Sequence, residues 1–202
     1  MTITYVYGNN LYVNTTNQCS CNCEFCVRIT GDGVGTGNNL WLEREPTKEE
    51  ILAAIEKEKL EKYQEVVFCG FGEPTFRWDD IAWVCENLKR RHDVTIRLDT
   101  NGHGNLICGR DITLELTGRV DIVSVSLNRS DEQQYLAVCR PTIPNAFSAM
   151  LEFTRLATKT VKTVVMTVVD NMPQEEIDRC EQLAKSLGAG FRVRHYSTVW
   201  TA

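Results

Sequence analysis

The sequence predicts an α/β fold built on one parallel sheet of six strands. Short apolar or alternating segments recur along the 202 residues, and amphipathic helical segments separate them. Strands that alternate with helices in this way form parallel sheets with right-handed crossovers. An open, three-quarter (β/α)6 barrel and a flavodoxin-like sheet both fit this alternation. No repeat, low-complexity tract or linker is present, so residues 1–202 are expected to form one domain.

The strands follow from local patterns. Ile3, Tyr5 and Tyr7 alternate with polar residues, and a Gly8–Asn10 turn leads into a second extended segment at 11–15, which predicts a hairpin. The second leg of the hairpin is the first strand of the parallel sheet. The other five strands are expected at 65–69, 94–98, 121–127, 163–169 and 191–195.

Helix start and stop signals place the helices between these strands. Thr47 and Glu50 form a capping box ahead of an apolar stripe that contains Ile51 and Ile55. Ser130 with Gln133 is expected to cap the helix after the fourth parallel strand. Further helices are expected at 79–91, at 112–116 before Gly118, from Asn145, and from Pro173 to Gly188.

Composition gives no reason to expect a charged or lipid partner. Hydrophobic residues make up 43% and charged residues 24%, as in ordinary soluble globular proteins. The formal net charge of −5 does not indicate nucleic-acid or membrane-surface binding. The first residues lack the features of a signal peptide, and no apolar run reaches the length of a membrane span. With nine cysteines, the expected location is the reducing cytoplasm.

The densest chemical signal is a cysteine run that follows the hairpin. Cys19, Cys23 and Cys26 have C-x3-C-x2-C spacing within a loop expected at 17–40. Three thiolates suit a four-iron cluster, because one iron is then left without a protein ligand and can bind a small molecule. Two alternatives stay open: a zinc site in which Cys21 is the fourth ligand, and a thioredoxin-like redox pair at Cys23 and Cys26.

This run resembles the signature of the radical SAM family, which also has an aromatic residue, here Phe25, before the last cysteine. The resemblance implies a partial TIM-like barrel that holds a [4Fe-4S] cluster on Cys19, Cys23 and Cys26. The open iron would bind S-adenosylmethionine, and reductive cleavage would give a 5′-deoxyadenosyl radical that abstracts hydrogen from an unidentified substrate. A one-electron donor such as flavodoxin or ferredoxin is the implied partner.

Further segments supply candidate cofactor contacts. Gly70-Phe71-Gly72-Glu73-Pro74 resembles the family's G-x-G-E-P motif, in which the glycines would let the ligand approach the backbone and Glu73 would accept from the methionine ammonium. A turn with a solvated glutamate is the structural alternative. The candidate cofactor-binding set is Gly70, Gly72, Glu73, Pro74, Ser126, Asn128, Arg140 and Arg194. The two arginines are included because each could pair with an anionic group.

Other polar residues at strand ends have no assigned role. Asp99 belongs to a Leu-Asp-Thr-Asn-Gly segment and either orients hydroxyls or precedes a simple turn. His195 has no evident partner in the sequence, and no catalytic residue is assigned. Gly31–Asn39 is expected to be a mobile loop near the cluster. A second cluster on Cys21, Cys69, Cys108 or Cys139 stays open, while Cys85 and Cys180 are expected in the core.

Over nearly its whole length the chain resembles the TatD-nuclease-associated radical SAM proteins. The resemblance is carried by Leu11–Asn14, Cys26-Val27-Arg28, Asn39–Pro46, Phe68–Thr75, Cys139-Arg140-Pro141 and Phe191–Arg194. It implies a functional link to a TatD-type nuclease and names no substrate. Two alternatives are a glycyl-radical-enzyme activating enzyme, which would need a large protein partner, and a zinc or iron–sulfur binding module without catalysis.

Overall fold

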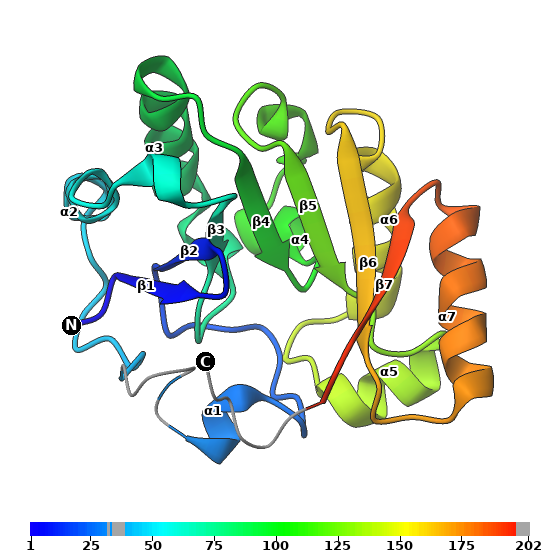
Figure 1. Ribbon diagram of the computed structural model, residues 1–202. Helices are drawn as coiled ribbons and strands as arrows, with labels where there is room; N and C mark the ends of the chain where they lie inside the picture. The colour runs from blue at the N-terminus through cyan, green and yellow to red at the C-terminus, as the bar shows by residue number, and fades with distance from the viewer. Residues whose placement is uncertain (32, 34–38, 197–202) are drawn as a thin grey trace.

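The computed structural model describes residues 1–31, 33 and 39–196, and within them seven strands form one sheet in sequential order (Figure 1). The first two form the expected hairpin, β1 (Thr4–Tyr7) antiparallel to β2 (Asn10–Asn14). From β2 onward all neighbours are parallel, so the six predicted parallel strands are confirmed. The others are β3 (Val66–Cys69), β4 (Ile96–Thr100), β5 (Ile122–Ser126), β6 (Thr163–Val169) and β7 (Gly190–Arg194).

The strand order separates the two architectures that the sequence left open. A flavodoxin-like sheet reverses its order and carries helices on both faces, whereas this sheet runs from β1 to β7 without reversal. Its crossover helices lie along one face (Figure 1). β1 and β7 do not pair, so the structure is an open, partial TIM-like barrel. The longer crossover helices are α2 (Lys48–Glu56), α3 (Trp78–Arg91), α6 (Ala146–Ala157) and α7 (Gln174–Ser186).

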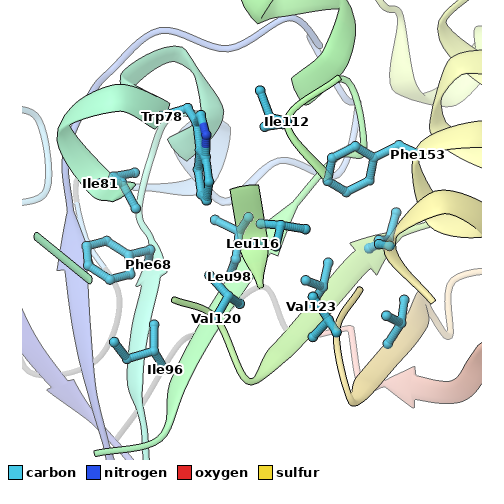
Figure 2. Close-up of a cluster of buried hydrophobic side chains, with 14 of the residues drawn as sticks. Phe68, Trp78, Ile81, Ile96, Leu98, Ile112, Leu116, Val120, Val123 and Phe153 are labelled. Carbon is cyan, nitrogen blue, oxygen red and sulfur yellow. The ribbon is translucent and has the colours of Figure 1, made fainter. Parts of the chain in front are cut away.

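Side chains alternate along each strand, so one face of the sheet contributes to the hydrophobic core and the other faces the interior of the barrel. Figure 2 shows Phe68, Leu98 and Val123 on the side of the sheet that faces Trp78 and Phe153. Because successive strand residues point to opposite faces, the residues between them point away from this core. On β4 and β5 those residues are polar, so the inner face of the barrel is lined by groups that can bind a ligand.

Most predicted helices are confirmed, and one cap prediction is wrong. Thr47 and Glu50 form the predicted capping box of α2. The N-cap of α5 (Glu132–Cys139) is Asp131, whose side chain accepts from the Gln134 N–H at 3.0 Å, and not Ser130. Asp131 lies one residue closer to the helix, and the Ser130 N–H instead donates to Glu176 on α7 at 2.6 Å.

Two short elements also differ from the prediction. The helix expected at 112–116 is a single 3-10 turn, η3 (Thr113–Leu116). A further helix, α4 (Gly104–Cys108), follows β4 and ends at Gly109, which has a left-handed φ of 65°. Its five residues are too few for a hydrophobic period to reveal it. The remaining short elements are α1 (Val27–Thr30), η1 (Leu60–Lys62) and η2 (Pro74–Arg77).

The expectation of a mobile glycine-rich loop falls mainly on residues 32 and 34–38, which lie outside the described residues. Among the helices that are described, none has the length and apolar character that a membrane crossing requires.

Candidate active site

The carboxyl ends of the parallel strands surround a cavity of about 240 Å³. All three signature cysteines line it, together with residues from the ends of β3 to β7. Most of the predicted cofactor-binding residues also line it, namely Gly70, Gly72, Glu73, Ser126, Asn128 and Arg194. Parallel barrels place their active sites at this end because the loops after the strands converge there.

The segment that carries the cysteines is held in place by backbone hydrogen bonds from across the barrel. The N–H of Asn22 donates to the carbonyl of Cys139 at 3.1 Å, and the N–H of Glu24 donates to Val138 at 3.0 Å. On the other side, the N–H of Thr142 donates to the carbonyl of Ser20 at 2.9 Å. Backbone hydrogen bonds to the Cys139-Arg140-Pro141 segment and its two flanking residues therefore fix the position of the cysteine loop.

The thiols differ in their electrostatic surroundings. Hydrogen bonds from Cys139 and Cys21 hold the pKa of the Cys23 thiol below its ordinary value, so Cys23 is primed to be a thiolate. Burial raises the pKa of Cys19 to about 12. A metal or cluster that binds Cys19 must therefore displace a proton from a thiol that otherwise retains it.

The Gly70–Pro74 turn packs directly on the cysteine segment. A Cβ added at Gly72 would lie 2.3 Å from the carbonyl oxygen of Thr16, and one at Gly70 would lie 2.2 Å from the Asn14 side chain. The Glu73 N–H donates to the carbonyl of Gln18 at 2.7 Å. The glycines thus let two protein segments approach each other, whereas the sequence interpretation had a ligand in that space.

Replacing Gly72 by alanine is expected to destabilise the fold by about 1–3 kcal/mol, the usual cost of overpacking. The methyl group would meet backbone rather than a side chain that can move aside. Gly190→Ala is the matched control, because its Cβ would make an ordinary contact at 3.6 Å. Urea unfolding of both variants measures the difference. Equal unfolding midpoints would show that the cysteine segment yields to the added methyl.

Glu73 is buried and accepts hydrogen bonds from residues at the ends of β3 and β4. Its Oε1 accepts from the Thr75 N–H at 3.1 Å and from the hydroxyls of Thr75 and Thr100, both at 2.7 Å. Its Oε2 accepts from the Asn101 N–H at 2.7 Å. Burial raises the pKa of Glu73, and these donors counter that effect. One lone pair of Oε2 remains for a ligand ammonium, so the predicted cofactor contact is compatible with this arrangement.

A buried polar network that the sequence did not reveal supports the cysteine loop. His103 is fully buried, and its Nδ1 lies 2.9 Å from the Ser20 hydroxyl while its Nε2 lies 3.0 Å from the Tyr135 hydroxyl. Asn101 donates to the same Ser20 hydroxyl at 2.9 Å. The only sequence signal was the Asn101–His103 run after β4. The partners of His103 are far away in the chain, so no local pattern connects them.

Acid is expected to weaken the fold through His103. Burial lowers the pKa of His103 from 6.5 to about 4. Between pH 6.5 and 4 the imidazole is therefore mostly protonated in the unfolded chain and mostly neutral in the folded chain. The stabilising contribution is complete above pH 6.5 and is lost as the pH falls toward 4. At 1.36 kcal/mol per pH unit, the free energy of unfolding should drop by about 1 kcal/mol between pH 7.5 and 5.5.

Urea unfolding at the two pH values measures this drop, and His103→Gln is the control, because glutamine can replace the hydrogen bonds without titrating. The drop should be smaller in the variant by the stated amount. An identical drop in both proteins would assign the acid sensitivity to other groups.

The remaining predicted residues differ in whether they line the cavity. Asn128 has a left-handed φ of 63°, and its Oδ1 is buried without a partner among the described residues, whereas its Nδ2 contacts Cys139 Sγ at 3.4 Å. Pro74 and Arg140 do not line the cavity. Arg140 ends α5 with a left-handed φ of 45°, and its side chain is exposed, 3.5 Å from Glu24.

His195 does have a partner, although none was evident in the sequence. Its Nδ1 lies 2.8 Å from Oδ2 of Asp170, which follows β6, and the Tyr196 N–H donates to Oδ1 of the same carboxylate at 2.6 Å. His195 and Tyr196 both line the cavity. These hydrogen bonds lower the pKa of Asp170, so the carboxylate stays ionised beside the imidazole.

A protein-family comparison identifies the superfamily. The model of the radical SAM superfamily matches residues 13–186, which include the cysteines and the ends of β2 to β6. The chain belongs to the radical SAM superfamily. Among curated proteins, a probable dual-specificity RNA methyltransferase RlmN from Clostridium acetobutylicum is 28% identical over 144 residues. That match covers 64% of this chain and 36% of the methyltransferase, so this radical SAM chain corresponds to about a third of that relative.

Solved structures share the fold at low identity. A radical SAM methyltransferase from Sphaerobacter thermophilus has a TM-score of 0.66 and 15% identity, and the match covers 95% of this chain and 68% of that one. Methylornithine synthase (PylB) also has a TM-score of 0.66 and 15% identity, with coverage of 93% and 53%. Streptococcus suis SuiB bound to S-adenosylmethionine has a TM-score of 0.65 and 15% identity, with coverage of 94% and 39%.

The residues present fit the cofactors that the superfamily implies. Cys19, Cys23 and Cys26 are free thiols of intermediate burial in one cavity. No three Cys, His, Asp or Glu side chains in the described part of the chain are grouped closely enough to hold a single ion. The superfamily implies an iron–sulfur cluster, in which the three thiolates could each bind a different iron, so such a group is not required. The unpartnered Asn128 Oδ1 can accept from a ligand hydroxyl.

Proposed function

We propose that this protein is a radical SAM enzyme that binds a [4Fe-4S] cluster on Cys19, Cys23 and Cys26 and acts on an unidentified substrate. The supporting observation is that all three thiols line one cavity together with the polar ends of β3 to β7. When bound, the cluster supplies the electron that cleaves S-adenosylmethionine to methionine and a 5′-deoxyadenosyl radical, which takes hydrogen from the substrate.

In this proposal the chain's own residues bind and orient S-adenosylmethionine. Glu73, tied to β4 through Thr100 and Asn101, presents its remaining lone pair to the methionine ammonium. Ser126 and the unpartnered Asn128 Oδ1 accept from hydroxyls of the ribose. Arg194 lines the cavity and can pair with a carboxylate, whereas exposed Arg140 would need to turn inward to do so.

The narrower proposals rest on sequence resemblance. We propose that the chain is one domain of the TatD-nuclease-associated group and has a functional link to a TatD-type nuclease. A flavodoxin or ferredoxin in the cytoplasm would supply the electron. The paired motifs Phe68–Thr75 and Cys139-Arg140-Pro141 support this assignment. In this chain both segments pack on the residues around the cysteines.

Anaerobic reconstitution with iron and sulfide tests the proposed function. About four irons and four sulfides per chain, and release of 5′-deoxyadenosine from S-adenosylmethionine after addition of dithionite, are the expected results. A colourless zinc protein that leaves S-adenosylmethionine intact would support a binding module instead. Cleavage that occurs only together with a large protein partner, and leaves a glycyl radical on that partner, would support an activating enzyme.

A further inference from the structure

The inner face of the sheet has a second cavity beside the one that the cysteines line. Its volume is about 480 Å³, within the range of about 300–1,000 Å³ typical of small-molecule sites. Its walls come from both edges of the open sheet, with Tyr5 and Tyr12 from β1 and β2 and Arg192 and Arg194 from β7. The two arginines and Asp99 line both cavities, so a ligand in the second cavity would adjoin the first.

The charges that line this second cavity do not balance. Asp99 is the one carboxylate among the described residues around it, and its Oδ1 already lies 2.8 Å from Nε of Arg97. Arg97 in turn pairs with Glu65 as well. Within the described ranges, neither Arg192 nor Arg194 forms an ion pair with a carboxylate. Both arginines are exposed, and Arg192 lies 3.5 Å from the Ser124 hydroxyl. Two guanidinium groups that face a cavity without a carboxylate partner favour an anionic ligand.

The register of β7 brings the two arginines to one face. Arg192 pairs with Thr167 and Arg194 with Val169, and both of these β6 residues also line the first cavity. Residues two apart on a strand lie on the same face, about 6.6 Å apart along it. The two guanidinium groups can therefore contact one anionic group from two sides, and each presents the planar fork that matches a carboxylate or a phosphate.

The opposite wall is aromatic. The rings of Tyr5 and Tyr12 are stacked, with centroids 5.3 Å apart and an interplanar angle of 26°. The Arg97 guanidinium lies 5.8 Å from the centre of the Tyr12 ring and donates to its hydroxyl at 3.1 Å. These contacts fix Tyr12 in place, so the wall offers a rigid aromatic edge to a ligand. A ligand that fills the cavity must match cations at one end and aromatic surface at the other.

We propose that the second cavity, hereafter the tyrosine–arginine cavity, binds the substrate of the proposed reaction as an organic anion. Its carboxylate or phosphate lies at Arg192 and Arg194, and its apolar ring packs against Tyr12. The inference rests on the proposed function, since it takes the ligand to be the molecule from which the 5′-deoxyadenosyl radical abstracts hydrogen. It also assigns Arg194 to the substrate rather than to the cofactor.

Binding of simple anions to the reconstituted full chain tests this inference without turnover. Calorimetry with phenyl phosphate, phenylacetate, inorganic phosphate and uncharged 2-phenylethanol distinguishes the contributions of charge and ring. At least one of the two aromatic anions should bind more tightly than both inorganic phosphate and the alcohol. Whether phenyl phosphate or phenylacetate binds more tightly then identifies phosphate or carboxylate as the preferred group. Binding of neither anion, or equal binding of the alcohol, would overturn the inference.

Variants then locate the site. Arg192→Gln and Arg194→Gln should each weaken binding of the preferred anion at least about tenfold, as expected for loss of a charged hydrogen bond. Arg155→Gln is the control, because Arg155 lies on α6, pairs with Glu152 and lines neither cavity. Affinity for S-adenosylmethionine should stay unchanged in Arg155→Gln, and in the two other variants it should fall much less than affinity for the anion. Weaker cofactor binding with unaltered anion binding would return Arg194 to the cofactor and overturn the inference.

The two proposals can fail separately. Anion binding that depends on the arginines, in a chain that forms no cluster and does not cleave S-adenosylmethionine, would refute the proposed function and leave an anion site. Normal cleavage in a chain that does not bind the aromatic anions would refute the tyrosine–arginine cavity as the substrate site and leave the proposed function intact.

Discussion

Alanine at Cys19, Cys23 or Cys26 is expected to abolish cluster assembly and reductive cleavage of S-adenosylmethionine together. The three thiols are the cysteines of the signature, and each would hold a different iron of the cube, so none can replace another. Each variant should lose the visible absorbance of the cluster after reconstitution and release no 5′-deoxyadenosine above background. Circular dichroism checks that the α/β fold is retained.

Two other cysteines serve as controls for this prediction. Cys108→Ala should keep full cleavage, because Cys108 lies on α4 and does not line the cysteine cavity. Cys21→Ala distinguishes a three-thiolate site from a four-thiolate site, since Cys21 is the buried extra thiol beside Cys23. Loss of metal in Cys21→Ala as well would favour the zinc alternative. Full cleavage in any variant of the triplet would remove that cysteine from the ligand set.

The sequence predicts the frame of the site because strand ends are local features. Each apolar strand is followed directly by its polar residues, so Cys19, Gly70–Pro74 and Ser126 could be assigned to one edge of a sheet before their positions were known. The alternation of strands and helices, however, does not fix the strand order. The sequential order β1 to β7 depends on which side each crossover takes, and that is decided by packing across the whole sheet.

What the sequence could not predict is the set of contacts between distant segments. Gly70 and Gly72 look like a ligand-binding turn, yet the atoms nearest to their missing Cβ positions belong to Asn14 and Thr16. His103 gives no local sign that it meets Ser20 and Tyr135. Asn14 ends β2, Thr16 lies shortly before the first cysteine, and Ser20 lies between the cysteines. Packing therefore constrains the residues around the cysteines in addition to any requirement of the cofactor.

Glu73→Ala is expected to lower the free energy of unfolding by about 3–5 kcal/mol, comparable to breaking a buried charged pair. The carboxylate accepts from two backbone N–H groups, those of Thr75 and Asn101, and from two threonine hydroxyls. The hydroxyls can rotate toward other acceptors, but the N–H groups cannot. Removing the carboxylate therefore leaves buried donors without partners where β3 and β4 end, directly against the cysteine segment.

Urea unfolding of the chain without cofactors measures this effect, and Glu73→Gln is the matched control. A glutamine oxygen at the Oε1 position keeps three of the donors, while its amide group faces the Asn101 N–H as donor against donor. The loss in this variant should therefore be smaller than in Glu73→Ala. Affinity for S-adenosylmethionine, measured well below the unfolding midpoint, separately tests the ammonium contact and should weaken by about 1.5–3 kcal/mol in the alanine variant. Unchanged stability with weaker cofactor binding would mean that Glu73 serves the ligand alone. Lower stability with unchanged cofactor affinity would mean that Glu73 only joins the strands that surround the site.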